Sequence, residues 1–324
     1  MSRYRKSRLA TGVISVMKQM LFFEQTTSSI KELNAVIDNF ASALIAIRNL
    51  RCEVRGILAE CPDFTEEMFH ARYHFDKKIR WKNYRTKFGA LPFSEQEEAF
   101  TWYLLYSTCA VFEGWLAKMK EAGLITSTMI KDLQFPVSAA NKMNAHISAD
   151  TSQIMTSAFY PSYRTNKKYS YQNITALLYC YRTFKEMRNA LVHSGKIATQ
   201  KCVAAYCDYQ NNCTTVTLGT KEIPVVHSMS LGAPIVPSFR GVIGFTDIVI
   251  RILISYDTEL IRTKVAEQYF LNKYRAIPES RNLPSANRGK ANRQFLSKIR
   301  KCGFSISGCV SDLQKFLTMH GFNC

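Results

Sequence analysis

Residues 171–195 read YQNITALLYCYRTFKEMRNALVHSG, and the spacing of their apolar side chains decides the fold class. Apolar positions recur every three or four residues, which predicts an amphipathic helix that ends at His193, with Gly195 as its C-terminal cap. A guanidinium in a core-facing stripe is costly to bury alone, so Arg188 needs an acidic or phosphate partner. The stripe that contains it consists of Leu177, Tyr181, Phe184, Arg188 and Leu191.

Helical spacing continues on both sides of this segment, which favours a mainly α protein. The expected elements are long helices over 28–60, 94–122 and 245–274, a charged helical segment over 64–88, and short helices over 127–133, 138–147 and 311–319. The first long helix is expected to begin at Thr27 or Ser28, whose hydroxyl groups are suitable N-caps.

Between the motif helix and the last long helix, the character of the chain changes. Residues 203–218 are β-branched and alternate weakly, and the following stretch contains Pro224, Pro234 and Pro237. These features predict a small insertion over 196–243 that is β-containing or irregular.

The ends of the chain differ from its middle in composition. We therefore expect a basic N-terminal arm (1–27), a helical domain (28–275) and a basic C-terminal tail with short helices (276–324), which we interpret as flexible. No run of eighteen uncharged apolar residues is present, so we expect no membrane span.

The cysteines do not predict a metal site. Cys202, Cys207 and Cys213 lack the two-residue gap that is typical of zinc knuckles. Because we find no secretory signal, we expect reduced thiols, a cytoplasmic location, and neither a metal nor a cofactor.

The chain is strongly basic, which bears on its partners. Its 324 residues carry a formal net charge of +18, so the surface should attract polyanions. Cations track phosphates and aromatic rings stack on unpaired bases, as in single-strand binders; a solvated basic face is the alternative. Aromatic and basic residues alternate over 69–88, and basic residues recur in the C-terminal tail. The candidate nucleic-acid-binding residues are Arg72, Lys77, Lys78, Arg80, Trp81, Lys82 and Arg85 in the first of these segments and Arg288, Lys290 and Arg293 in the tail.

Glu113 is the candidate partner of Arg188. It lies in the apolar segment AVFEGWL (110–116), and none of the residues three or four positions away is basic. Its charge must therefore be balanced from elsewhere in the fold, and we expect it to pair with Arg188 and orient it. Asn189 and His193 are four residues apart and share a face beside the Arg188 stripe. We expect the histidine ring to turn toward the arginine in the last helical turn.

An acidic residue in an aromatic-flanked helix, followed by Arg-Asn-x-x-x-His at the end of a later helix, resembles the HEPN superfamily of nucleases. The order of helices over 28–274 is also similar to that of the family. The resemblance implies a helical bundle and a metal-independent endoribonuclease, with Arg188 and His193 as catalytic residues, Asn189 as a polar assistant and Glu113 as the supporting acid. It also implies a homodimer with a composite site, and a role as a toxin or in antiphage defence with an antitoxin or defence-system partner.

The residue chemistry fits this activity. Histidine titrates near neutrality and can take a proton from the 2′-hydroxyl group, while arginine can bind two phosphate oxygens. Two alternatives remain open. The pair of Glu113 and Arg188 can be a purely structural ion pair, with His193 stabilised by the helix dipole, or the fold can serve a non-catalytic nucleic-acid-binding or scaffold protein.

Overall fold

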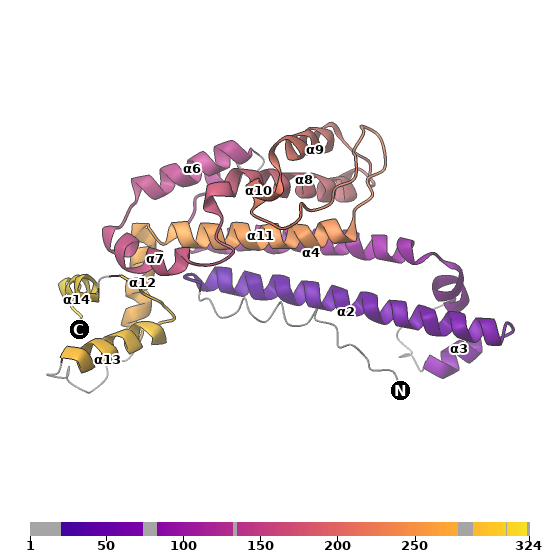
Figure 1. Cartoon of the computed structure of the whole chain (residues 1–324), viewed down its shortest axis with the longest axis horizontal. Helices are drawn as coiled ribbons and strands as arrows, with labels where there is room; N and C mark the ends of the chain where they lie inside the picture. Colours follow the sequence, from indigo (N-terminus) through magenta and orange to yellow (C-terminus); the bar gives the residue numbers. More distant parts are fainter. Residues whose placement is uncertain (1–20, 74–82, 132–134, 278–287, 309, 323–324) are drawn as a thin grey trace.

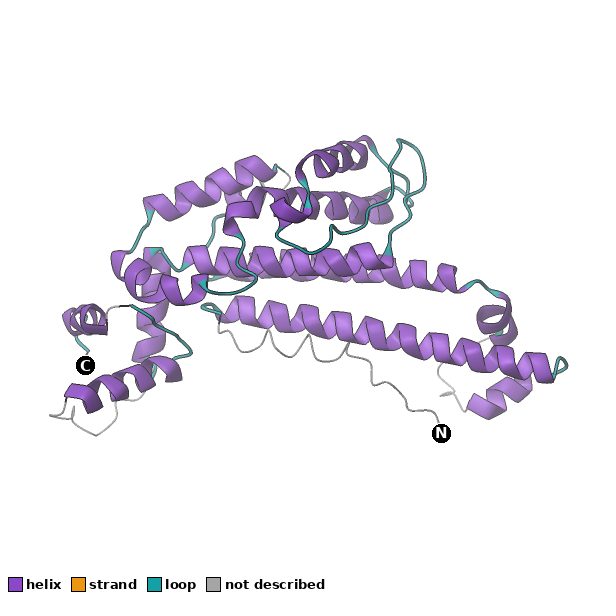
Figure 2. Cartoon of the chain, viewed as in Figure 1, coloured by secondary structure: helices purple, strands orange, loops and turns teal. Residues whose placement is uncertain are grey.

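The computed structural model describes residues 21–73, 83–131, 135–277, 288–308 and 310–322. The mainly α prediction is confirmed, since this part of the chain contains helices and no β-strand (Figure 2). Its longer helices are α2 (Glu24–Glu60), α4 (Phe93–Glu121), α6 (Pro136–Ala149), α8 (Ile174–His193), α9 (Gln200–Asn212), α11 (Phe239–Leu260), α12 (Lys264–Arg275), α13 (Arg288–Lys301) and α14 (Val310–Met319). Shorter elements are α3 (Glu66–Tyr73), η2 (Arg85–Ala90), α5 (Ser127–Lys131), η4 (Met155–Phe159), α7 (Tyr160–Arg164), η5 (Tyr171–Asn173) and α10 (Thr215–Leu218).

The centre of the molecule is made by α2, α4, α8 and α11, which pack side by side (Figure 1). Aromatic rings fill the space between them: Phe112 of α4 contacts Tyr181 of α8 with ring centroids 4.4 Å apart, and Phe184 stacks on Phe245 of α11 at 4.5 Å. The stripe of α8 predicted to face the core does so, because Leu177, Tyr181 and Phe184 are fully buried. The apolar period of this helix thus sets which face it presents to α4 and α11.

The first long helix begins at Glu24 rather than at the hydroxyl-bearing residues expected as its cap. The reason is a distant acceptor: the buried Asp257 carboxylate of α11 accepts hydrogen bonds from the backbone N–H groups of Phe22 (2.8 Å) and Phe23 (3.1 Å). Burial raises the pKa of Asp257 to about 6, although these backbone donors and Thr26 oppose the shift. Residues 22 and 23 are therefore fixed in the core just before the helix starts.

At its far end, α2 packs against α3 and η2 around a small second core of Val54, Phe69, Tyr84 and Phe88. The helix expected over 64–88 is present in part: α3 covers 66–73, η2 is a π-helix over 85–90, and 74–82 lie outside the described residues. The buried Arg51 of α2 donates hydrogen bonds to the backbone oxygens of Lys87 and Leu91. This arginine satisfies carbonyl groups that the end of a helix leaves without an intrahelical donor.

The prediction of β-structure over 196–243 is wrong, because part of this segment is helical. Residues 200–212 form α9, with Thr199 as an N-cap whose side chain accepts from the Cys202 N–H. The β-structure described within 196–243 is an isolated antiparallel bridge between Ile197 and Pro234. The 200–212 segment is helical, despite the strand preference predicted from β-branched residues, because the helix buries Cys202, Ala205 and Tyr209 on one side. The irregular part of the prediction holds for 219–238, which contains no helix or strand.

The helix expected over 245–274 is divided in two. α11 ends at Leu260, and Thr263 starts α12 by accepting a hydrogen bond from the Ala266 N–H. The C-terminal residues contain the expected short helices, α13 and α14, but their described parts are not a flexible tail, because Phe295, Ile299, Phe304, Leu313 and Leu317 belong to the main core. None of the helices in the described ranges is long and apolar enough to cross a membrane.

Candidate functional site

The pairing of Arg188 with Glu113 is present. Arg188 Nη2 donates a hydrogen bond to Glu113 Oε1, which joins α8 to α4. The Arg188 side chain is 15% exposed and Glu113 is 39% exposed, so the pair lies at the edge of the core, within reach of solvent. The arginine carbon Cζ also lies 6.0 Å from the ring centroid of Tyr106, which is exposed on α4.

Two further groups, which were not among the candidate residues, complete the surroundings of this ion pair. Lys185 lies 3.4 Å from the same Glu113 oxygen, and the buried Cys109 thiol lies near the Arg188 guanidinium. Burial opposes the charged form of Arg188, but Glu113, Cys109 and Tyr181 together outweigh it and hold the pKa of the guanidinium above its ordinary value. Burial also raises the pKa of Cys109 to about 12, so this thiol stays protonated at neutral pH and is a poor nucleophile.

Lys185 could be identified from the sequence, because it precedes Arg188 by three residues and so lies beside it on the helix surface. Cys109 carries a weaker signal, because it lies one turn before Glu113 on α4.

Asn189 and His193 are not drawn into the Arg188 cluster. Asn189 Nδ2 lies 3.4 Å from Glu186 Oε2 on the same helix, and His193 is exposed with no hydrogen bond or ion pair to any described residue. Because α8 stays helical through His193, the five-residue step from Arg188 directs the two side chains about 140° apart around the axis. Within one chain, therefore, the side chains of Arg188, Asn189 and His193 do not lie together as expected.

The candidate nucleic-acid-binding residues are dispersed. Arg72 forms an ion pair with Glu53 at 3.1 Å, and Arg85 donates to the Phe64 carbonyl oxygen at 2.7 Å. Arg293 and Lys290 lie exposed on α13, where Arg293 donates to the Gly289 carbonyl oxygen at 3.3 Å. Arg288 begins that helix. The remaining members, Lys77, Lys78, Arg80, Trp81 and Lys82, lie outside the described residues.

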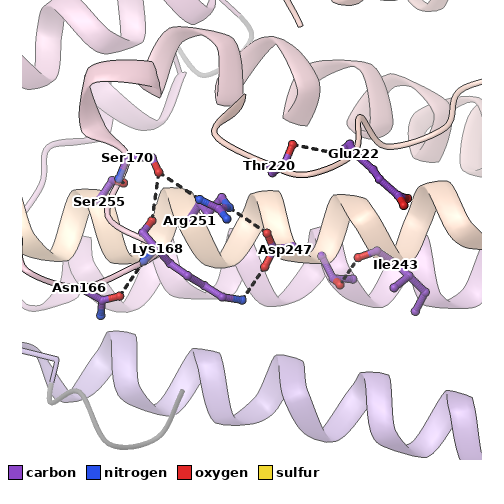
Figure 3. A network of polar contacts seen from close by, with 10 residues as sticks. Asn166, Lys168, Ser170, Thr220, Glu222, Ile243, Asp247, Arg251 and Ser255 are labelled. Atoms are coloured by element: carbon purple, nitrogen blue, oxygen red, sulfur yellow. Dashed lines mark hydrogen bonds and ion pairs between the residues drawn. The ribbon is translucent and has the colours of Figure 1, made fainter. Parts of the chain in front are cut away.

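A second polar cluster, at the loop that precedes α8, has the residue types of an active site (Figure 3). Asp247 of α11 forms ion pairs with Lys168 and, at 2.8 Å, with Arg251, and Arg251 donates to the Ser170 hydroxyl at 3.2 Å. Burial would raise the pKa of Asp247, but Lys168 and Arg251 outweigh it and hold the value below its ordinary range. Since these groups bind one another, the cluster fixes the 166–170 loop on α11 and is structural.

The described residues contain no group of three or more His, Cys, Asp or Glu side chains arranged to hold a metal ion. Comparison with protein-family models, with curated proteins and with solved structures gives no match to this chain.

Proposed function

We propose that this chain is a metal-independent endoribonuclease with a HEPN-like helical bundle, in which Arg188, His193, Asn189 and Glu113 serve the reaction. The observation that carries the proposal is the ion pair between Glu113 of α4 and Arg188 of α8. This is the contact that the resemblance implies, and it joins two helices through a partly exposed guanidinium. An arginine held in this way can offer an exposed N–H donor, other than the buried Nε, to a phosphate oxygen.

The chemistry assigned to these residues is general acid–base catalysis. His193 takes the proton of the 2′-hydroxyl group and returns a proton to the 5′-oxygen that leaves, and Arg188 stabilises the charge that develops on the phosphate. The products are a 2′,3′-cyclic phosphate and a 5′-hydroxyl end. Because His193 points away from Arg188 on its own helix, the complete site requires the residues of a second copy, which makes the active form a homodimer.

The surface beside Arg188 is suited to such a second copy. Tyr103 and Tyr106 of α4 are 64% and 49% exposed, and Val192 of α8 is 49% exposed, so apolar surface lies next to the ion pair. We further propose a cytoplasmic protein that acts as a toxin or in antiphage defence, together with an antitoxin or defence-system partner.

The experiment is RNA cleavage by the purified full-length chain in EDTA, with Arg188→Ala and His193→Ala as variants. We expect each variant to lose roughly 10²-fold or more of the rate, which is typical when a general acid–base group is removed. Lys118→Ala is the matched control, because it removes an exposed cation of α4 that pairs with Glu32 at 3.5 Å and is not part of the proposed site. Undiminished cleavage by both variants would exclude these residues from the reaction.

A non-catalytic nucleic-acid-binding protein is the second candidate. It is favoured by one specific observation: His193 is exposed and has no hydrogen bond or ion pair to any described residue. In that case the wild-type chain binds RNA in the same buffer and leaves it intact.

A further inference from the structure

A groove on the side of the bundle opposite α2 is not used by the ion pair of Arg188 and Glu113. It has a volume of about 770 Å³ and is lined by residues of α6, α8 and α9. Figure 1 shows α6 and α9 at the top of the molecule, on the other side of α11 from α2. The lining residues that matter here are Phe135, Val137, Asn141, Tyr179, Arg182 and Asp208.

Two aromatic rings line this groove. Phe135, directly before α6, is 55% exposed, and Tyr179 of α8 is partly exposed. Neither ring contacts another aromatic ring in the part of the chain that the structure describes, whereas buried rings such as Phe112 and Phe184 do. An exposed phenylalanine in a concave site is an available surface for a flat apolar ligand.

A fixed cation lies beside these rings. Arg182 Nη1 donates to Asp208 Oδ2 of α9 at 2.7 Å, which uses one of the five N–H donors of the guanidinium. The Arg182 side chain is only 20% exposed, so it is held in one place at the edge of the groove. An immobilised guanidinium next to an aromatic ring matches a ligand that has a phosphate group attached to a flat base.

The groove is continuous with residues already assigned to catalysis. Tyr179, Arg182, Glu186, Asn189 and His193 follow one another at steps of three and four residues, so they share one face of α8. All five are partly or fully exposed. Along the helix axis, Arg182 lies about 10 Å from Asn189 and about 16 Å from His193, a span that a few nucleotides of extended RNA can cover.

We propose that the groove between α6, α8 and α9 binds one unpaired nucleotide of the RNA, with the base against Phe135 and Tyr179 and the phosphate at Arg182. The strand then runs along the exposed face of α8 toward Asn189 and His193. This assignment rests on the proposed ribonuclease function and adds a base-binding subsite to it. The net charge of +18 favours a polyanion over an apolar peptide as the occupant.

The test measures binding separately from cleavage. The probe is a fluorescein-labelled 2′-O-methyl RNA, which lacks the attacking hydroxyl group, titrated with the full-length chain in EDTA at one fixed salt concentration. We expect Tyr179→Ala and Phe135→Ala each to weaken binding by roughly 10-fold, the usual loss when one stacking ring is removed. Tyr179→Phe keeps the ring and should bind within about 2-fold of wild type.

Two controls separate stacking from general effects. Arg182→Ala should weaken binding more than Arg164→Ala, which removes an exposed cation of α7 outside the groove and so reports only the change in net charge. A series of probes with one abasic position each should contain one position whose missing base weakens binding to wild type but not to Tyr179→Ala. That non-additivity is the direct sign of a base against Tyr179.

The outcomes distinguish the two proposals. If Tyr179→Ala and Phe135→Ala bind the probe as wild type does, or lose no more than Arg164→Ala, the groove does not bind RNA, whether or not the chain cleaves. That result is also expected if the groove accepts a peptide. If the abasic coupling is found but wild type cleaves no unmodified RNA, the subsite stands and the ribonuclease function fails.

Discussion

Arg188 and Glu113, which are 75 residues apart in the sequence, form an ion pair that joins α8 to α4 at the edge of the core. The arginine is largely buried and the carboxylate is partly exposed, with Lys185 as a second cation 3.4 Å from the same carboxylate oxygen. The pair therefore has a structural effect that can be measured whether or not it takes part in catalysis.

Loss of this pair should reduce stability in a way that depends on both partners. We expect Arg188→Ala and Glu113→Ala each to lower the free energy of unfolding by about 1–3 kcal/mol, as for hydrogen bonds to charged groups. The double variant should lose less than the sum, with a coupling energy of about 1–2 kcal/mol in urea denaturation. Lys185→Ala is the matched control and should cost less, because its ammonium group is farther from the carboxylate and more exposed. Simple additivity would show that the contact contributes nothing in solution.

Mixing two inactive variants tests the composite site. If one copy supplies Arg188 and the other His193, a heterodimer of Arg188→Ala and His193→Ala contains one intact site and one site that lacks both residues. Half of the dimers in an equimolar mixture are heterodimers, so about a quarter of the wild-type cleavage rate should return after subunit exchange. Sites built within single chains would give no recovery, since every site would then lack one residue.

Asp257 predicts a pH dependence of stability with a defined sign. Its carboxyl group is fully buried, and its pKa is raised from an ordinary 3.8 to about 6. Between these values the folded chain binds more protons than the unfolded chain, so this group makes the protein less stable as the pH rises from about 4 to about 6. A shift of this size lowers the free energy of unfolding by about 3 kcal/mol at pH values well above this range, relative to pH values well below it.

The matched variant is Asp257→Asn, which cannot titrate. The difference in free energy of unfolding between wild type and Asp257→Asn should change by about 2 kcal/mol from pH 4 to pH 6.5, because wild type becomes less stable as the pH rises. Denaturation curves at several pH values give this difference directly. A constant difference over that range would mean that Asp257 does not titrate there in the folded chain.

The parts of the fold that follow from local periodicity could be predicted from sequence. The helix expected over 94–122 is α4 within a residue, and the faces of α4 and α8 that carry Glu113 and Arg188 do meet. A carboxylate in an apolar segment and a guanidinium on a core-facing stripe leave few other arrangements, because each needs the opposite charge.

Features set by distant contacts could not be predicted. The start of α2 depends on Asp257, which is more than 230 residues away. The π-helix η2 depends on Arg51 of α2, and the helical state of 200–212 depends on packing against α8, where Thr183 donates to the Ala205 carbonyl oxygen at 2.9 Å. The expected approach of His193 to Arg188 did not occur for a local reason, since the last turn of α8 stays helical.

The C-terminal helices provide the last prediction, because their docking depends on one glycine. A Cβ atom added at Gly308 would lie 2.1 Å from the backbone oxygen of Ser157, so Gly308 lies directly against the middle of η4. Gly308→Ala should therefore cost about 1–3 kcal/mol, as overpacking against a rigid neighbour does, and should expose α13 and α14 to protease. Gly56→Ala is the contrasting variant: it lies inside α2 with nothing within 4 Å of the added atom, and it should stabilise by about 0.5–1 kcal/mol. If both variants melt like wild type and Gly308→Ala gives no shorter fragment on limited proteolysis, the C-terminal helices do not depend on this contact.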